Sequence, residues 1–256
     1  MSKKRKQKLD VRGLIASAEK GDVTAQRMLV WHYLTLGGGA KFQLAMTWLR
    51  RAAWREDEWA QYMLGFAYQE GDGVPKSKSL AAKWYEKAAA QGYDSAQLNL
   101  GIIKANRRGK ARDLASAVKL YRLAARQGNR NACYNLGLYY SEGRGVPQNM
   151  RQAFRWFQRA AEHGDKDAQC HVGYCYHEGE GVRRDFGEAV KWYRKAARKG
   201  IASASYNLGL CYQSGDGTRV SEAIANRWFK KAAAKGHSLA KSKLTEGKNK
   251  KALKNQ

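Results

Sequence analysis

The chain has 256 residues, with 48 Lys and Arg against 22 Asp and Glu, and its formal net charge is +26. The length suffices for a substantial core, and 43% hydrophobic residues exclude a disordered polycation. No apolar run reaches the roughly 18 residues of a membrane span, and no apolar segment follows the basic N-terminus as in a secretory signal. Transmembrane proteins, secreted disulfide scaffolds and acidic proteins are excluded, and a cytoplasmic location, or a nuclear one in a eukaryote, is expected.

Two basic tails flank the body of the chain. Residues 1–10 carry a net charge of +4 and include KKRK at positions 3–6, which fits a nuclear signal or a binding arm. The last sixteen residues carry +5, and 245–256 form a lysine-rich tail. The remaining +17 lies in residues 11–240, so most of the excess belongs to the body, residues 11–244. An excess of this size suggests an acidic partner.

A block typified by KWYEKAA recurs every 36 residues. Its second position is Trp or Leu, and an alanine stands three residues before it. These second positions are Trp48, Trp84, Leu120, Trp156, Trp192 and Trp228. The spacing predicts an amphipathic helix, called helix B here, whose aromatic residues are mostly core anchors.

A second pattern precedes each later block. Alanine, leucine and tyrosine fall at i, i+4 and i+8, as in Ala60, Leu64 and Tyr68, and predict a further helix, helix A. The glycine beside the leucine, such as Gly65, costs a helix about 1 kcal/mol relative to alanine. We therefore expect a neighbouring helix to cross there at close range.

Turns of the form Gly-x-Gly join helix A to helix B, as at Gly71 and Gly73, and suit a left-handed helix cap followed by a tight turn. Such helical hairpins bury their apolar faces only by stacking on their neighbours. We predict an all-α fold, an α-solenoid of about six helix-turn-helix repeats of 36 residues with helical caps at 9–20 and 237–254. The predicted repeats are 22–56, 57–92, 93–128, 129–164, 165–200 and 201–236.

Residues 60–92, AQYMLGFAYQEGDGVPKSKSLAAKWYEKAAAQG, resemble the Sel-one-like repeat (SLR) family, relatives of the tetratricopeptide repeats. The resemblance extends over residues 14–244. The first repeat departs from the pattern with Val30 in place of the helix A glycine, and the third departs in its loop, KANRRGKARD. The family implies a protein–protein scaffold without chemistry of its own.

Basic residues cluster around the helix B tryptophan position, one residue before it and two or three after it. Those at +3 belong to the family pattern, whereas those at −1 and +2 go beyond it. The candidate basic surface consists of Lys83, Lys87, Lys119, Arg122, Arg155, Arg159, Lys191, Arg194, Lys195, Arg227 and Lys230, with Arg107, Arg108, Lys110 and Arg112 in the third loop. It fits a solvated face, an acidic protein partner, an anionic membrane surface, or nucleic acid or a ribonucleoprotein.

Helix A supplies a second candidate surface, a concave groove lined by amides and aromatic rings. Its expected residues are Asn99, Tyr134, Asn135, Tyr139, His171, Tyr174, Tyr206 and Asn207. A peptide or a helix fits such a groove, although some of these positions also suit packing between repeats.

No cofactor, metal site or catalytic residue is predicted. The four cysteines include no C-x-x-C pair, and Cys175 and Cys211 occupy equivalent positions of adjacent repeats, too far apart for a disulfide. Free thiols in a reducing compartment are expected. A metal held by His171, Cys175 and Cys211 is conceivable but lacks a fourth ligand, and the scattered histidines form no triad.

Overall fold

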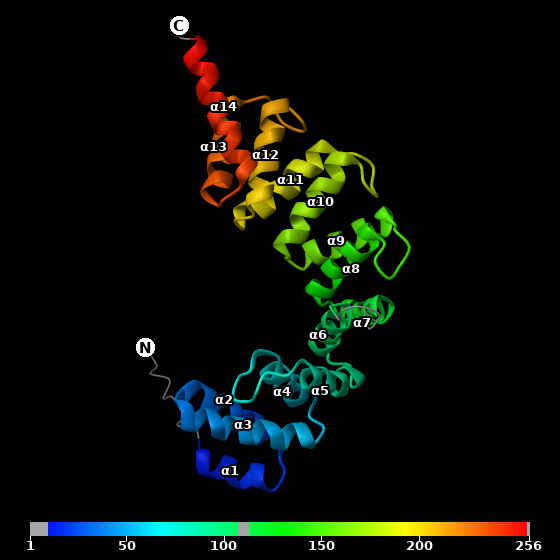
Figure 1. Ribbon diagram of the computed structural model, residues 1–256, viewed down its shortest axis with the longest axis vertical. Helices are drawn as coiled ribbons and strands as arrows, with labels where there is room; N and C mark the ends of the chain where they lie inside the picture. Colours follow the sequence, from blue (N-terminus) through cyan, green and yellow to red (C-terminus); the bar gives the residue numbers. More distant parts are fainter. Residues whose placement is uncertain (1–9, 107–112, 255–256) are drawn as a thin grey trace, which may run out of the picture. The chain divides into compact units, whose positions relative to one another are not determined.

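The computed structural model describes residues 10–106 and 113–254, with side chains described as far as Glu246. Within these residues the chain forms fourteen α-helices and no strand, so the predicted all-α fold is confirmed (Figure 1). The first six helices are α1 (Val11–Glu19), α2 (Val23–Leu36), α3 (Gly39–Trp54), α4 (Glu58–Glu70), α5 (Lys78–Ala90) and α6 (Asp94–Ala105). The others are α7 (Leu114–Arg126), α8 (Arg130–Glu142), α9 (Met150–Glu162), α10 (Lys166–Glu178), α11 (Phe186–Arg198), α12 (Ala202–Ser214), α13 (Glu222–Ala234) and α14 (Ser238–Lys254).

The helices fall into two compact units, which meet in the chain at Asp113 and Leu114. In the first unit α2 packs on α3 and α4 on α5; in the second, α8 packs on α9, α10 on α11 and α12 on α13. Each of these pairs is the helix A and helix B of one predicted repeat, and each helix also packs on the next one along its unit. The predicted caps are present as α1 and α14. None of the described helices combines the length and the apolar character that crossing a bilayer requires.

Local sequence signals set the helix ends. Asp22, Asp57, Asn129 and Asp165 each begin a helix A by accepting a hydrogen bond from a backbone N–H of its first turn. The first glycine of the turn ends helix A in the left-handed conformation, at Gly71, Gly143, Gly179 and Gly215. The predicted Gly-x-Gly turns are therefore confirmed.

The helix A glycine lies against a buried ring of helix B, which confirms the predicted close crossing of a neighbouring helix at this position. A Cβ at Gly65 would lie 2.8 Å from the Tyr85 ring, and one at Gly137 would lie 2.4 Å from the Phe157 ring. The rings at this position are all buried: Tyr85, Tyr121, Phe157, Tyr193 and Phe229. Each directly follows the tryptophan position, which is buried at Trp48 but only half-buried in the later repeats. The aromatic core anchors predicted on helix B are therefore, in most repeats, the rings that follow the tryptophan position. Adjacent helical residues point about 100° apart, and the second of the two faces the core.

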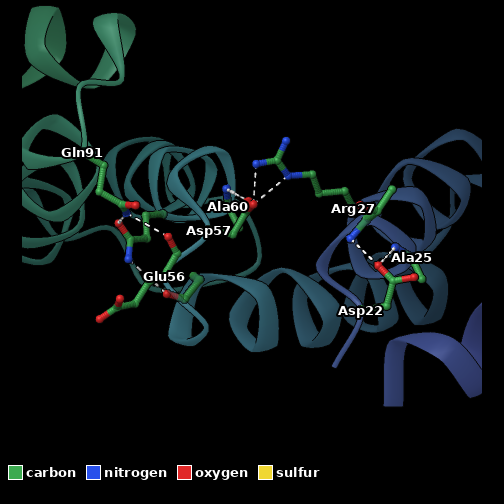
Figure 2. Close-up of polar contacts among 10 residues, drawn as sticks. Asp22, Ala25, Arg27, Glu56, Asp57, Ala60 and Gln91 are labelled. Carbon is green, nitrogen blue, oxygen red and sulfur yellow. Dashed lines mark hydrogen bonds and ion pairs between the residues drawn. The ribbon is translucent and has the colours of Figure 1, made fainter. Parts of the chain in front are cut away.

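Buried glutamines connect consecutive helices. Gln61 donates through Nε2 to the carbonyl oxygen of Ala53, eight residues earlier, at 3.2 Å. Gln26, Gln97 and Gln169 make the equivalent bond to Ala18, Ala89 and Ala161. Gln91 donates to the Gln61 side chain at 3.0 Å and to the Glu56 carbonyl at 2.8 Å (Figure 2). The bonds from Gln26, Gln61, Gln97 and Gln169 give a second donor to carbonyl groups at the C-terminal ends of α1, α3, α5 and α9, which also accept from a backbone N–H three residues later.

Candidate functional site

The cations three residues after the tryptophan position lie over the tryptophan rings. The Lys195 Nζ is 3.9 Å from the Trp192 ring centroid, and the Lys231 Nζ is 4.3 Å from that of Trp228. Arg51, Lys87 and Arg159 lie in the same way over Trp48, Trp84 and Trp156. A cation over an indole face is attracted to it and shields it from water. Of the candidate basic surface, Lys87, Arg159 and Lys195 are therefore engaged with tryptophan rings of their own helices, and Lys87 also lies over Trp54 of α3.

Two of the arginines that stand two residues after the tryptophan position, Arg122 and Arg194, are engaged as well. Arg194 donates to the Tyr212 hydroxyl at 3.2 Å, and Arg122 donates to that of Tyr140. Both tyrosines belong to the following helix A, so these bonds join one repeat to the next. Lys230, at the same position of α13, is exposed.

Most cations one residue before the tryptophan position are open, that is, exposed and without an ion pair among the described residues. In the second unit the cations at this position are Lys119, Arg155, Lys191 and Arg227, and we call them the helix B cation row. All four are exposed. Lys191 pairs with Glu188 on its own helix at 2.7 Å, whereas the other three have no ion pair within the described residues. Lys83 is the exposed equivalent on α5 of the first unit.

The charge of the described helices is segregated by helix type. Each of α3, α5, α7, α9, α11 and α13 carries at least three Lys or Arg and at most one acidic residue. The helix A elements together hold fewer cations than acidic residues: Arg27, Lys104, Arg130 and Lys166 against Glu58, Glu70, Asp94, Glu142, Asp167 and Glu178. The basic loop residues Arg107, Arg108, Lys110 and Arg112 lie outside the described part of the chain.

Most of the predicted groove residues are half-buried and engaged in packing. Asn99 donates to the Tyr85 hydroxyl at 3.2 Å, and Tyr206 stacks on His237 with ring centroids 4.5 Å apart. Asn135 and Asn207 are half-buried on α8 and α12.

Tyr139 does not line a groove, and its prediction was wrong. Its side chain is 5% exposed and packs edge-on against Tyr121, with ring centroids 5.3 Å apart. Tyr139 lies seven residues after Ala132 and therefore faces the core with it.

Tyr134, His171 and Tyr174 come together around a pocket in the second unit. We call it the Tyr174 pocket; its volume is about 330 Å³. It is lined by Tyr134, Asp167, Cys170, His171, Tyr174, Ile201, Ser203 and Asn207. The Tyr134 hydroxyl lies 3.2 Å from the His171 Nε2, and the imidazole stacks on the Phe157 ring at 4.6 Å. Burial lowers the pKa of His171, so its ring is uncharged at neutral pH.

The first unit contains an aromatic and ionic cluster that the sequence analysis missed. Arg27 donates through Nε to Asp57 at 2.8 Å (Figure 2). Its guanidinium also lies over the Trp59 ring. Trp59 stacks with Trp31, which is 58% exposed. The available signal was the cation at Arg27, where the later repeats place other residue types.

The four cysteines are free thiols, and Cys133, Cys175 and Cys211 are buried. Burial raises the pKa of Cys175 and of Cys211 to about 12, so both thiols stay protonated and unreactive at neutral pH. Among the described residues, no group of three or more His, Cys, Asp or Glu is arranged to hold a metal ion.

Comparison with known proteins agrees with this architecture. No match was found among curated proteins. Among solved structures, a protective antigen of uropathogenic Escherichia coli with an SLR fold is 35% identical, with a TM-score of 0.85 over 91% of this chain. This chain covers only 50% of that protein. A Sel1 repeat protein from Oxalobacter formigenes is 34% identical, with a TM-score of 0.75 over 86% of this chain and 87% of the other.

The Sel1 repeat model matches six consecutive segments, which follow the predicted repeats closely. They are residues 30–53, 60–93, 94–129, 130–165, 166–201 and 202–237. Together with the alternating helices, the left-handed glycine caps and the close glycine–aromatic contacts, these matches show that the chain belongs to the Sel1 repeat family.

Proposed function

We propose that this protein is a non-enzymatic scaffold that binds an acidic protein partner through the helix B cation row. Sel1 repeat proteins generally mediate protein–protein interaction, and their scaffold is generally non-enzymatic. The observation that carries the proposal is the open state of Lys119, Arg155 and Arg227, which have no ion pair within the described residues. Their equivalent positions in successive repeats offer cations at a regular interval to one acidic surface.

The same proposal includes a reducing compartment such as the cytoplasm, because all four cysteines are free thiols. Nucleic acid remains the second candidate for the basic surface. Phosphate binding rests on similar cations, but its affinity falls steeply with salt concentration.

Affinity capture with two matched triple variants tests the proposal. Lys119→Gln/Arg155→Gln/Arg227→Gln removes the three open cations. Arg159→Gln/Lys195→Gln/Lys231→Gln removes the same amount of charge, but from side chains that lie over tryptophan rings. We expect proteins that stay bound after nuclease treatment at moderate salt, and we expect the first variant to lose them while the second retains them. If nuclease releases everything captured, the nucleic-acid function is correct instead. Equal loss from both variants would also refute a specific role for the cation row.

A further inference from the structure

The Tyr174 pocket differs in charge from the helices around it. Of the residues that line it, Asp167 is the one that carries a full charge, and none is Lys or Arg. Asp167 is exposed in the first turn of α10 and has no ion pair within the described residues. A chain of net charge +26 thus leaves an unneutralised carboxylate at the edge of an aromatic pocket.

The other titratable groups of the pocket do not offset that carboxylate. Burial lowers the pKa of His171 and keeps its ring neutral. Burial and, to a lesser extent, the negative field of Asp167 raise the pKa of Cys170 to about 11, so the thiol stays protonated. Burial and the field of Asp167 likewise raise the pKa of Tyr134. Asp165 is occupied as the N-cap of α10, where it accepts from the Ala168 N–H at 2.7 Å.

The walls of the pocket suit a flat cation. Tyr174 is 42% exposed, and its hydroxyl lies 3.4 Å from the Glu180 Oε1, which leaves a second carboxylate close to the ring. Tyr134 is held by the hydrogen bond to His171, and His171 is held by stacking on Phe157. A guanidinium group stacks on aromatic faces and pairs with a carboxylate through two parallel hydrogen bonds, which an ammonium group cannot do.

We infer that the Tyr174 pocket binds the side chain of an arginine presented by a protein partner, with Asp167 as its ion pair and Tyr174 as its stacking surface. The volume of about 330 Å³ accommodates one long side chain. Ser203 and Asn207, which line the pocket from α12, supply further polar groups for the partner chain. This site lies on helix A elements and takes the opposite charge from the helix B cation row, so it adds a second contact to the proposed scaffold.

Binding of a small arginine probe tests the inference directly. The full-length protein, carrying ¹³C-labelled tyrosine, is titrated with N-acetyl-arginine amide and, separately, with N-acetyl-citrulline amide, which has nearly the same shape but no charge. We expect the arginine probe to shift the ring signals of Tyr134 and Tyr174, and the citrulline probe to bind roughly tenfold more weakly. Equal binding of the two probes, or shifts that exclude both tyrosines, would overturn the site.

Matched variants test whether Asp167 is the carboxylate that pairs with the arginine probe. Asp167→Asn should weaken the arginine probe roughly tenfold, and Tyr174→Leu should weaken it roughly threefold through loss of stacking. Glu162→Gln is the control, because it removes the same charge from an exposed position of α9 outside the pocket. An unchanged affinity in Asp167→Asn, or an equal loss in Glu162→Gln, contradicts the assignment. The triple variant of Lys119, Arg155 and Arg227 leaves the pocket intact, so failure of this inference and failure of the proposed function are separately visible.

Discussion

Asp57 and Asp22 are equivalent residues in different surroundings. Each begins a helix A: Asp57 accepts from the Ala60 N–H at 2.8 Å, and Asp22 accepts from the Ala25 N–H at 3.2 Å. The second oxygen of Asp57 faces the Arg27 guanidinium, and the side chain is 5% exposed. The second oxygen of Asp22 accepts from the Ser17 hydroxyl on the surface. The same helix cap is therefore coupled to a long-range ion pair in one repeat and to a local hydrogen bond in the other.

Asparagine at these two positions separates the ion pair from the cap. Asparagine caps a helix about as well as aspartate, but in Asp57→Asn its amide nitrogen would face the Arg27 donors. We expect Asp57→Asn to lower the free energy of unfolding by about 1–3 kcal/mol, and Asp22→Asn to leave it nearly unchanged. Urea unfolding followed by circular dichroism measures both. Equal losses would mean that the Arg27–Asp57 pair contributes nothing beyond the cap.

The turns between helices combine two kinds of glycine. Gly179 has φ of 79°, and a Cβ there would lie 3.4 Å from the Arg184 Cβ, an ordinary contact. Gly181 has φ of 73°, but a Cβ there would lie 2.1 Å from the carbonyl oxygen of Met150, at the start of α9 in the preceding repeat. The first glycine serves the cap of its own helix, whereas the second allows two repeats to approach.

Alanine substitution distinguishes these two requirements. Gly179→Ala should lower the free energy of unfolding by about 1 kcal/mol, because alanine is strained in the left-handed conformation. Gly181→Ala should lower the free energy of unfolding by roughly 1–3 kcal/mol more than Gly179→Ala, because the backbone of α9 must move. Hydrogen exchange at the first turn of α9 should accelerate in Gly181→Ala alone. Similar stability and similar exchange in both variants would show that the contact with Met150 is easily relieved.

The elements were predictable from the sequence because their signals are local and repeated. Alanine and glycine spacing identified helix A, helix B and both caps, and the cost of Gly65 predicted the close contact that Tyr85 makes. The uses of the cations were not predictable, since Arg194 and Lys195 are adjacent in sequence and bind different partners, Tyr212 and Trp192. The pairing of Arg27 with Asp57, across thirty residues, likewise follows from packing rather than from pattern.

For the molecule as a whole, the net charge of +26 affects the stability of the folded state as well as the binding of partners. Helix B elements hold most of the cations of the described helices, so like charges stand at equivalent positions of stacked repeats. Their repulsion destabilises the folded state and is screened by salt. Cations over tryptophan rings offset part of this cost through contacts that the open cations lack.

Melting temperatures of the two triple variants, measured at low and moderate salt, separate these contributions. At about 20 mM salt the Debye length is about 20 Å, so repulsion between neighbouring cations is weakly screened. We expect Lys119→Gln/Arg155→Gln/Arg227→Gln to melt about 2–4 °C above the wild type under these conditions. The difference should shrink at about 300 mM salt, where repulsion is screened. Arg159→Gln/Lys195→Gln/Lys231→Gln loses the same charge but also its ring contacts, so it should gain less at low salt and melt below the wild type at high salt. If both variants melted alike at both salt concentrations, position on helix B would be irrelevant to stability, and the distinction between open and ring-bound cations would fail.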